Sequence, residues 1–569
     1  MARPIDFPPP YGPIDAIGVP TDPPEERIDV GVLIVGGGPG GLACAIRLGQ
    51  LLEEHPEMRE RLGEVPVAVL EKGKQPGSHV VSGAVVNPRP LRRLFRGRLT
   101  MADLPSYGEV PGEAVFVLTR RSSYRIPPPP TMRNHGNYIF SASELTRFLG
   151  EQAEALGVAV LPETAAVRLL AQHGRVLGAR TGDKGRGRHG EPLPNFEPGN
   201  DIVAGVTVLA EGSQGLLTSA AIDHFGLAGE NPQIWALGVK EVWRVPRPLD
   251  RIVHTMGWPL RTLAGYGEFG GSFIYPMSRA GGDDLVTVGF VAGLEARDVE
   301  FSVHDVLQEF KTHRVVWDIL RGGERVGWGA KTITEGGYHS LPRKLSAPGL
   351  LLVGEGPGLV NVPRLKGIHY AIESGRLAAE AAFRALQRGE VPSRTGALDS
   401  YDEALRGTAM WRELYEVRNM RQAFDRGFFM GGALASMMIV TKGRAPNGRF
   451  PTHPNASWGL IKTGRARSYP KPDGKYLFDK LSSVFASGNR TRDDQPNHLE
   501  VARKVRRPVA EAWEWMCPAH VYAVGRDLGD DMVTVEVTPS NCIQCGAITA
   551  KGGRLTPPEG GSGPEYTLT

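Results

Sequence analysis

Three glycines and one acidic residue near the start of the chain have the spacing of a dinucleotide-binding site. The glycines follow a β-rich run at 29–35 and open an apolar-periodic segment; they are Gly36, Gly38 and Gly41. In such a pattern the first glycine permits a tight turn, the second lets the backbone approach a pyrophosphate, and the third allows close helix–strand contact. Glu71 ends a second β-rich run at 67–70, where a carboxylate can accept hydrogen bonds from ribose hydroxyls. Glu71 lies farther along the chain from the three glycines than is usual, and a helix extended through 51–63 explains this distance.

A second glycine-rich turn appears much later, at 352–358, and contains Gly354 and Glu355. This turn and the VLAEG segment at 208–212 lie where, in FAD enzymes with two dinucleotide folds, later parts of the chain come back to the cofactor. Such enzymes usually place an Asp at the position of Glu355. The set favours FAD over NAD and indicates a discontinuous nucleotide-binding domain.

Three of the four cysteines lie close to the C-terminus: Cys517, Cys542 and Cys545. A CxxC pair with a Cys-Pro is typical of iron–sulfur ligation, because thiolates on tight turns can converge on one cluster. The remaining cysteine, Cys44, belongs to the first glycine-rich segment. A zinc site that also uses His520, or merely buried thiols, are the alternatives. A disulfide framework would distribute its cysteines differently.

Two stretches suggest contact with a membrane surface. Residues 89–101 interleave apolar side chains with five arginines, and residues 427–440 carry no charged side chain. Apolar groups beside arginines suit an anionic membrane leaflet, although a solvated helix face or a buried core helix are the alternatives. No run approaches the roughly 18 to 20 apolar residues that a spanning helix needs, so the chain is not expected to cross a membrane.

The composition is that of a globular protein of about two to four domains, with 569 residues, 41% apolar and 22% charged. A net charge of +4 gives no reason to expect nucleic acid as a partner. Residues 1–28 form a Pro-rich arm without the features of a secretory signal. Residues 143–156 have the pattern of an amphipathic helix with Ser143 as N-cap, and 158–295 the pattern of an antiparallel sheet.

The chain resembles the electron transfer flavoprotein–ubiquinone oxidoreductase family along nearly its whole length. The resemblance rests on motifs in family order, among them VLIVGGGPGGLACAIRL (32–48), HVVSGAVVNPR (79–89), YGEFGGSFIY (266–275), NVPRLKGIH (361–369), NCIQC (541–545) and PEGGSGPEY (558–566). It implies an α/β and α+β fold: a discontinuous FAD domain with two dinucleotide-binding folds, an antiparallel-sheet quinone domain and a ferredoxin-like iron–sulfur domain. The implied ranges are an arm at 1–28, the FAD domain at 29–230 and 345–440, the quinone domain at 231–344 and the iron–sulfur domain at 441–569, with membrane-surface segments near 84–105 and 424–440.

The resemblance also implies site residues. For FAD they are Gly36, Gly38, Gly41, Glu71, Lys72, Gly83, Gly354, Glu355 and Asn361. For the quinone they are Gly270 and Gly271, with Phe273 and Tyr275 as apolar walls, and for the cluster Cys517, Cys542 and Cys545. No acid–base catalytic residue is expected, because electron transfer depends on the proximity of cofactors.

The sequence departs from the family pattern at two places. The family reads CxxCxxC, but here Cys545 is followed by Gly546, Ala547 and Ile548, so a third cysteine of the motif is absent and is interpreted as deleted rather than substituted. Three thiolates could hold a [3Fe–4S] cluster, a [4Fe–4S] cluster with another ligand, or no cluster. The second departure is Ile368, which replaces a Thr that would bond the flavin.

The implied function is the transfer of electrons from reduced electron transfer flavoprotein, through FAD and a [4Fe–4S] or altered cluster, to ubiquinone or menaquinone. The protein would lie peripherally on the cytoplasmic-side face of a bacterial plasma membrane or the matrix side of the mitochondrial inner membrane. The alternatives are an FAD-dependent reductase of prenyl lipids and a flavoprotein subunit that docks a separate ferredoxin.

Overall fold

The computed structural model describes all residues except 22–26, 264, 280, 391–395 and 463–466. Its first large sheet confirms the predicted βαβ unit, since β2 (Arg27–Val35), α1 (Pro39–Glu54) and β3 (Val67–Leu70) follow each other and the two strands pair in parallel. On the other side of β2 lies β14 (Asp201–Leu209), followed by the late strand β21 (Leu350–Leu352), both parallel to it. Because β21 joins this sheet, the nucleotide-binding domain is discontinuous, as predicted.

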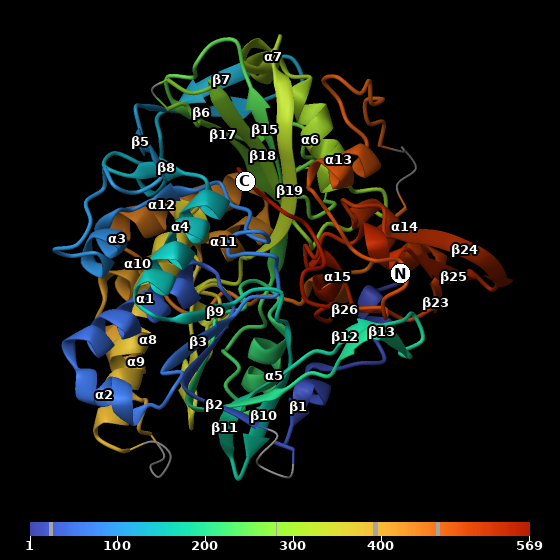
Figure 1. Ribbon diagram of the computed structural model, residues 1–569. Helices are drawn as coiled ribbons and strands as arrows, with labels where there is room; N and C mark the ends of the chain where they lie inside the picture. Colours follow the sequence, from blue (N-terminus) through green and yellow to red (C-terminus); the bar gives the residue numbers. More distant parts are fainter. Residues whose placement is uncertain (22–26, 264, 280, 391–395, 463–466) are drawn as a thin grey trace.

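Further strands complete this sheet: β1 (Ile17–Gly18), β9 (Ala159–Leu161), β10 (Ala166–Gln172), β11 (Arg175–Thr181) and β20 (Ser346–Ala347). The helices associated with it are α2 (Pro56–Arg61), α3 (Arg89–Leu94), α4 (Ala142–Ala155), α5 (Leu216–His224), α8 (Ile368–Gln387), α9 (Ser400–Arg406) and α10 (Ala409–Glu416). Figure 1 shows α1, α8 and α9 gathered beside the parallel strands. The apolar side chains between these layers form one core.

The second large sheet lies above the first in Figure 1. Its strands are β6 (Glu113–Leu118), β7 (Ser123–Ile126), β15 (Trp235–Arg244), β16 (Ile252–Gly257), β17 (Gly270–Pro276), β18 (Leu285–Gly293) and β19 (Glu324–Thr334), accompanied by α6 (Val303–Lys311) and α7 (Arg314–Leu320). All pairings are antiparallel except that of β6 with β16. The sheet therefore includes residues 113–126, outside the predicted range 231–344.

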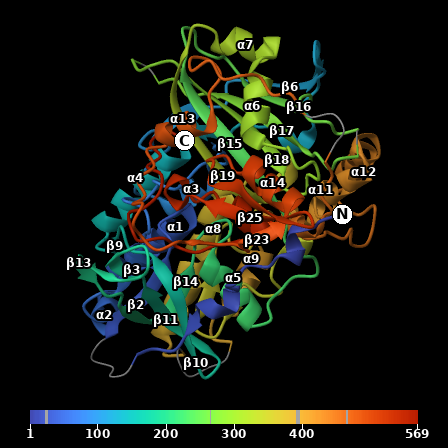
Figure 2. The same ribbon diagram turned by 90° about the vertical axis from the view of Figure 1, so that its right-hand side faces the viewer.

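The C-terminal part contains α13 (Lys480–Ala486), α14 (Arg507–Met516) and α15 (Ala547–Ala550), with an antiparallel sheet of β23 (Lys504–Arg506), β24 (Tyr522–Gly529) and β25 (Met532–Val537). The short strands β22 (Leu499–Glu500) and β26 (Arg554–Leu555) pair beside it. Its apolar residues share one core with the second large sheet, and Figure 2 shows β23, β25 and α14 close to β18 and β19. The cysteine-bearing segment is thus fixed to the sheet, and its described residues form no separate core.

The remaining elements are two small sheets and two helices. One sheet combines β4 (Val85–Val86), β8 (Tyr138–Phe140) and β5 (Ser106–Glu109), and the other pairs β12 (Lys184–Arg186) with β13 (Pro192–Glu197). The helices are α11 (Met420–Ala423) and α12 (Phe428–Thr441).

Three local predictions were wrong. The helix predicted at 143–156 begins at Ala142, with Ser141 as N-cap: its hydroxyl oxygen accepts from the Glu144 N–H at 3.2 Å. Glu144 lies three residues after Ser141, which is the spacing of a capping box. The Ser143 hydroxyl instead donates to the carbonyl oxygen of Thr569 at 3.1 Å.

The helix expected through 51–63 is broken at Pro56, which begins α2 and disfavours helical geometry at the residue before it. The antiparallel sheet expected over 158–295 is divided, because β10, β11 and β14 join the first sheet and β15 to β18 the second. The arm at 1–28 also contributes β1 and the start of β2 to the first sheet.

Candidate functional site

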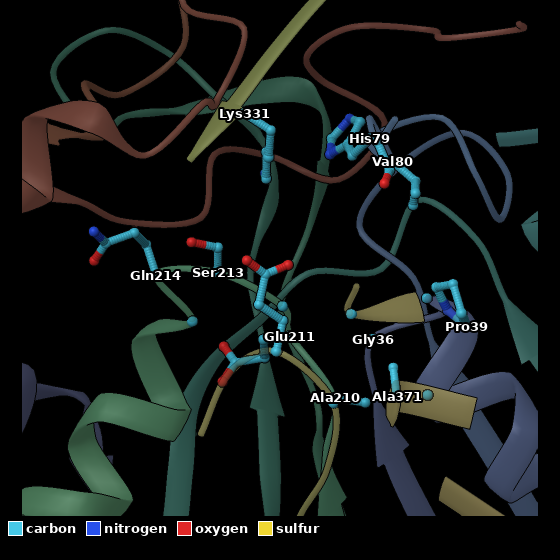
Figure 3. Close-up of a pocket in the computed structure, with 18 of the residues that line it drawn as sticks. Gly36, Pro39, His79, Val80, Ala210, Glu211, Ser213, Gln214, Lys331 and Ala371 are labelled. Carbon is cyan, nitrogen blue, oxygen red and sulfur yellow. The ribbon is translucent and has the colours of Figure 1, made fainter. Parts of the chain in front are cut away.

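A cavity of about 330 Å³ lies at the carboxyl ends of the parallel strands, where α1 begins. Its walls come from segments far apart in the sequence. Figure 3 shows Gly36 and Pro39 at one side, and the segment from Ala210 to Gln214, Lys331 of β19 and Ala371 of α8 around the same space. The position at the carboxyl ends of parallel strands is where open α/β sheets bind ligands.

The first glycine turn has the geometry that a pyrophosphate requires. Gly36 has φ +109°, and a Cβ there would collide with the Ala210 carbonyl oxygen. A Cβ on Gly41 would collide with the Gly36 carbonyl oxygen, so Gly41 lets α1 pack on the turn without itself lining the cavity. Gly38 lines the cavity, and a Cβ added to it would lie 4.0 Å from the nearest atom. The start of α1, which has no side-chain cap, therefore presents backbone N–H groups to the cavity.

Glu71 and Lys72 also line the cavity. The buried Glu71 carboxylate accepts hydrogen bonds from the Gly37 N–H (3.1 Å) and the Gly73 N–H (2.6 Å), which hold it beside the glycine turn. Burial raises its pKa, an effect opposed by these backbone donors and by Lys72. The Lys72 amine donates to the Gln544 side-chain oxygen at 2.6 Å, so it connects the cavity to the CxxC loop.

The second glycine turn closes the cavity, as predicted. Gly354, with φ +73°, and Glu355 both line it. Glu355 accepts a hydrogen bond from the Thr334 N–H at 3.0 Å. Burial raises the pKa of Glu355 to about 7, although that hydrogen bond and Lys331 favour the charged form. A group of this kind can change charge near neutral pH.

Other predicted residues are divided between the cavity and its surroundings. Gly83 lines the cavity against the rings of Phe273 and Tyr275, which also line it, as does Ile368. Asn361 does not line it: its side chain is buried and accepts from the Arg364 N–H, which caps a short 3₁₀ turn.

The two glycines expected at the quinone, Gly270 and Gly271, lie on β17 outside the lining of the cavity. A Cβ on Gly270 would collide with the Val291 carbonyl oxygen, and one on Gly271 would lie 2.7 Å from the Thr255 carbonyl oxygen. Close packing within the sheet therefore requires both glycines. Their role at a quinone stays a prediction.

The three C-terminal cysteines surround a second, small cavity. Cys517 ends α14, and Cys542 and Cys545 lie on the loop before α15. The Val521 N–H points to the Cys517 sulfur at 3.4 Å and the Gln544 N–H to the Cys542 sulfur at 3.3 Å. Burial raises the pKa of all three thiols, that of Cys545 to about 12.

The structure bears on the zinc alternative for the cysteines. Among the described residues, no group of three or more His, Cys, Asp and Glu side chains is arranged to hold one metal ion. His520 is exposed and does not line the cavity, so the zinc alternative that used it is not supported. Ile548, three residues after Cys545, lines the cavity together with the cysteines. That the third cysteine of the motif is deleted stays a prediction.

Strand β19 connects the two cavities. Thr332 lines the larger one, and its N–H and its hydroxyl both donate to the Cys545 carbonyl oxygen at 2.9 Å. The same hydroxyl lies 2.9 Å from that of Ser213, also in the larger cavity. The Lys331 amine donates to the Gln544 carbonyl oxygen at 2.9 Å. Thr332 of β19 thus lies between the cysteine loop and the larger cavity.

Several cavity residues were missed from the sequence: His79, Glu211, Ser213, Lys331, Thr332 and Lys366. Glu211 lay within a motif that was noticed, and its carboxylate accepts from the Thr218 N–H at 2.6 Å. Lys331 and Thr332 belong to no recognisable motif, because strand pairing in the second sheet brings them to the cavity.

The two predicted membrane segments differ in the structure. The prediction that the apolar side chains of 89–101 face a membrane was wrong for its central residues, because Leu91, Leu94 and Phe95 are buried in the first core. Helix α12 instead exposes Phe429 (76%) and Val440 (84%). None of the helices in the described part of the chain is long and apolar enough to span a membrane.

Comparison with known proteins decides the family. Residues 235–333 match the model "ETF-QO, ubiquinone-binding", and residues 474–567 match that of the 4Fe-4S domain of electron transfer flavoprotein-ubiquinone oxidoreductase. The mitochondrial electron transfer flavoprotein-ubiquinone oxidoreductase of Oryza sativa is 36% identical, over 95% of this chain and 93% of its own. That of Dictyostelium discoideum is 38% identical, over 96% and 91%. The chain belongs to the electron transfer flavoprotein–ubiquinone oxidoreductase family.

Membership of this family makes the chain an oxidoreductase and agrees with both cavities. Solved structures confirm the fold of the flavoprotein part. A geranylgeranyl bacteriochlorophyll reductase-like protein of Thermoplasma acidophilum aligns with a TM-score of 0.54, at 18% identity, over 74% of this chain and 92% of its own. The myxobacterial FAD-dependent halogenase CndH aligns with a TM-score of 0.50, at 16% identity, over 76% and 95%. At these identities the likeness concerns the fold alone.

Proposed function

We propose that this chain accepts electrons from reduced electron transfer flavoprotein and passes them, through FAD and an iron–sulfur cluster, to a membrane quinone, ubiquinone or menaquinone. The observation that carries the proposal is the direct bonding of the cysteine loop to the wall of the dinucleotide cavity, through Thr332 and Cys545. Electron transfer depends on short separations between cofactors, and this joint brings the two sites together. A prenyl-lipid reductase would not need the cysteine-bearing domain.

The cavity residues suit FAD. Gly36 and Gly38 let the backbone approach the pyrophosphate, the N–H groups of α1 offset its charge, and Glu71 lies where ribose hydroxyls would be recognised. FAD, when bound, supplies a carrier that exchanges electrons singly or in pairs. Glu355 and Lys331 lie in the same cavity, where they set the charge around the bound cofactor.

Three residues would hold the cluster, which supplies a one-electron carrier: Cys517, Cys542 and Cys545. Burial raises the pKa of all three thiols, and a partly buried lysine opposes this rise at each sulfur: Lys480 at Cys517, Lys331 at Cys545 and Lys72 at Cys542. The N–H groups that point to Cys517 and Cys542 act in the same direction. Hydrogen bonds of this kind tune a cluster's reduction potential.

The quinone would enter from a membrane surface beside α12, whose apolar side chains are exposed. Gly270 and Gly271 stay the proposed quinone contacts, with Phe273 and Tyr275, which line the cavity, as apolar walls. The named relatives are mitochondrial. We place the protein peripherally on the matrix side of that inner membrane, or on the cytoplasmic-side face in a bacterium.

The test mixes the purified, iron-replete protein with reduced electron transfer flavoprotein and a quinone analogue. Bleaching of the flavin bands and reduction of the quinone are expected. If the quinone stays oxidised with both partners present, the proposal fails.

A further inference from the structure

The cysteine cavity contains fewer ligands than a four-iron cluster requires. In a [4Fe–4S] cluster each of four irons takes one ligand from the protein, usually a Cys thiolate. Besides the three cysteines, the described residues that line the cavity are Leu499, Met516, Ala519, Val521, Tyr522, Ile543, Gly546, Ala547, Ile548 and Leu555. None of them is an Asp, Glu or His. Cys44 is buried in the first core, beneath the glycine turn.

Ile548 occupies the place from which a fourth ligand would come. It follows Cys545 by three residues, as Cys545 follows Cys542, and it lies in the first turn of α15. Its side chain is buried and lines the same cavity as the sulfurs. A branched hydrocarbon there has no donor atom that could bind an iron.

We infer that the three cysteines hold a three-iron [3Fe–4S] cluster, with Ile548 closing the corner of the cubane. Each thiolate then binds one iron, and no iron lacks a protein ligand. The inference rests on the proposed iron–sulfur site and specifies its cluster. The cluster exchanges one electron, in the couple [3Fe–4S]⁺ + e⁻ → [3Fe–4S]⁰, with reduced electron transfer flavoprotein as the proposed reductant.

The experiment uses the full chain with FAD, purified without oxygen so that a four-iron cluster cannot lose an iron to oxidation. Iron is quantified, and electron paramagnetic resonance spectra are recorded before and after reduction with dithionite. A three-iron cluster is paramagnetic when oxidised, whereas a four-iron ferredoxin-type cluster is paramagnetic when reduced. We expect about three irons per chain and a signal in the oxidised protein that reduction removes.

The variant Ile548→Cys supplies the missing thiolate, and Cys is smaller than Ile, so it fits. It should move the signal to the reduced protein and raise the iron content to about four per chain. Ile548→Val is the matched control and should retain the three-iron signal. Tyr522→Phe, which removes the one phenol among the described residues of the lining, should also retain it.

A reduced-state signal and four irons in the unaltered protein would overturn the inference while leaving the proposed function intact. Loss of that signal in Tyr522→Phe would then identify the phenol as the fourth ligand. An iron-replete protein without any cluster would overturn both the inference and the proposed iron–sulfur site. Quinone reduction by such a protein would show that electron transfer survives through FAD alone.

Discussion

At the scale of single residues, the glycines of the first turn have separate functions that follow from what an added Cβ would meet. At Gly36 and Gly41 it would meet backbone carbonyl oxygens, which cannot move without disturbing the sheet. At Gly38 it would come no closer than 4.0 Å to its nearest neighbour, and it would point into the space beside the cavity lining. Gly41 is therefore required for folding, whereas Gly38 is required for the approach of a ligand.

Gly41→Ala and Gly38→Ala should accordingly have different effects. Gly41→Ala should lower the free energy of unfolding by about 1–3 kcal/mol, with or without flavin, because of overpacking. Gly38→Ala should leave the flavin-free protein nearly as stable as the parent and weaken flavin binding, because the methyl group stands where the pyrophosphate approaches. Thermal unfolding and bound flavin content measure the two effects. Equal destabilisation of both flavin-free variants would contradict this division.

Glu355 should make stability depend on pH in the flavin-free protein. Its pKa is about 7 when folded, against an ordinary value of 4.5. Between these values the folded protein keeps a proton that the unfolded chain has released, so stability falls as pH rises from 4.5 to 7 and the penalty is complete above 7.

Glu355→Gln removes this titration. The stability of the variant relative to the parent should be about 3 kcal/mol greater at pH 8 than at pH 4. Denaturant unfolding at the two pH values measures the gain, and the exposed Glu64→Gln is the control. A gain no larger than that of the control would show that Glu355 is not forced toward its neutral form.

What the sequence revealed of the site was its local part. The glycine turns, Glu71 and the CxxC loop could be predicted because each is one contiguous segment with its own geometry. Lys331 and Thr332 could not be predicted, since their place depends on the pairing of β19 with β15 and on its approach to the cysteine loop. The place of Asn361 near the flavin stays a prediction: its side chain caps a turn, while its neighbours Val360 and Val362 line the cavity.

At the scale of elements, α3 and α12 show why composition alone did not identify the membrane-facing surface. Both segments are apolar enough to lie on lipid, but the side chains of α3 pack on α8 and the first core. Helix α12 buries Gly431 and Met438 and packs Leu434, Ala435 and Ile439 in part. Its exposed large apolar side chains are Phe429, Met430, Met437 and Val440. At the base of α12, Arg421 is buried between Glu295 and Glu335, which anchors the helix to the second sheet.

Leu94→Ala should therefore act on stability. The side chain is 1% exposed, and its truncation should lower the free energy of unfolding by about 2–4 kcal/mol through the lost contacts and the cavity left behind. Binding of the folded variant to anionic vesicles should equal that of the parent. Denaturant unfolding and vesicle co-sedimentation measure the two quantities. If the variant is as stable as the parent but binds vesicles more weakly, the side chain of Leu94 contacts the membrane and this prediction is wrong.

Changes on α12 should affect membrane binding and leave folding intact. The double variant Phe429→Glu/Val440→Glu removes two exposed apolar side chains, worth about 3 kcal/mol together, and should weaken vesicle binding by about a hundredfold. Reduction of a quinone embedded in vesicles should fall, while reduction of a water-soluble analogue should not. Phe485→Glu, at a residue 89% exposed on α13, is the matched control. Equal loss in the control would mean that α12 has no special role.

At the scale of the whole molecule, two sheets and two cores hold the cofactor sites at fixed positions. The first core supports the dinucleotide cavity, and the second joins the second large sheet to the C-terminal part. The discontinuous domain could be predicted because its late glycine turn is local. The contribution of 113–126 to the second sheet could not, since β6 pairs in parallel with a strand more than a hundred residues away. The contact between the sites is thus a product of tertiary structure.

That contact should be measurable at Thr332. Thr332→Val keeps the shape of the side chain and removes the hydroxyl, which bonds the Cys545 carbonyl oxygen and the Ser213 hydroxyl. Loss of such a hydrogen bond costs about 1 kcal/mol. If the barrier to electron transfer rises by this amount, the rate falls about fivefold. Single-turnover reduction should therefore slow between cluster and flavin, with flavin content unchanged. The control is Thr334→Val on the same strand, because the Thr334 hydroxyl has no hydrogen-bond partner among the described residues. Rapid-freeze spectra would follow both cofactors after mixing with reduced electron transfer flavoprotein. If the rate of electron transfer between cluster and flavin is the same in the two variants, the hydrogen bonds of the Thr332 hydroxyl support the structure but do not contribute to electron transfer.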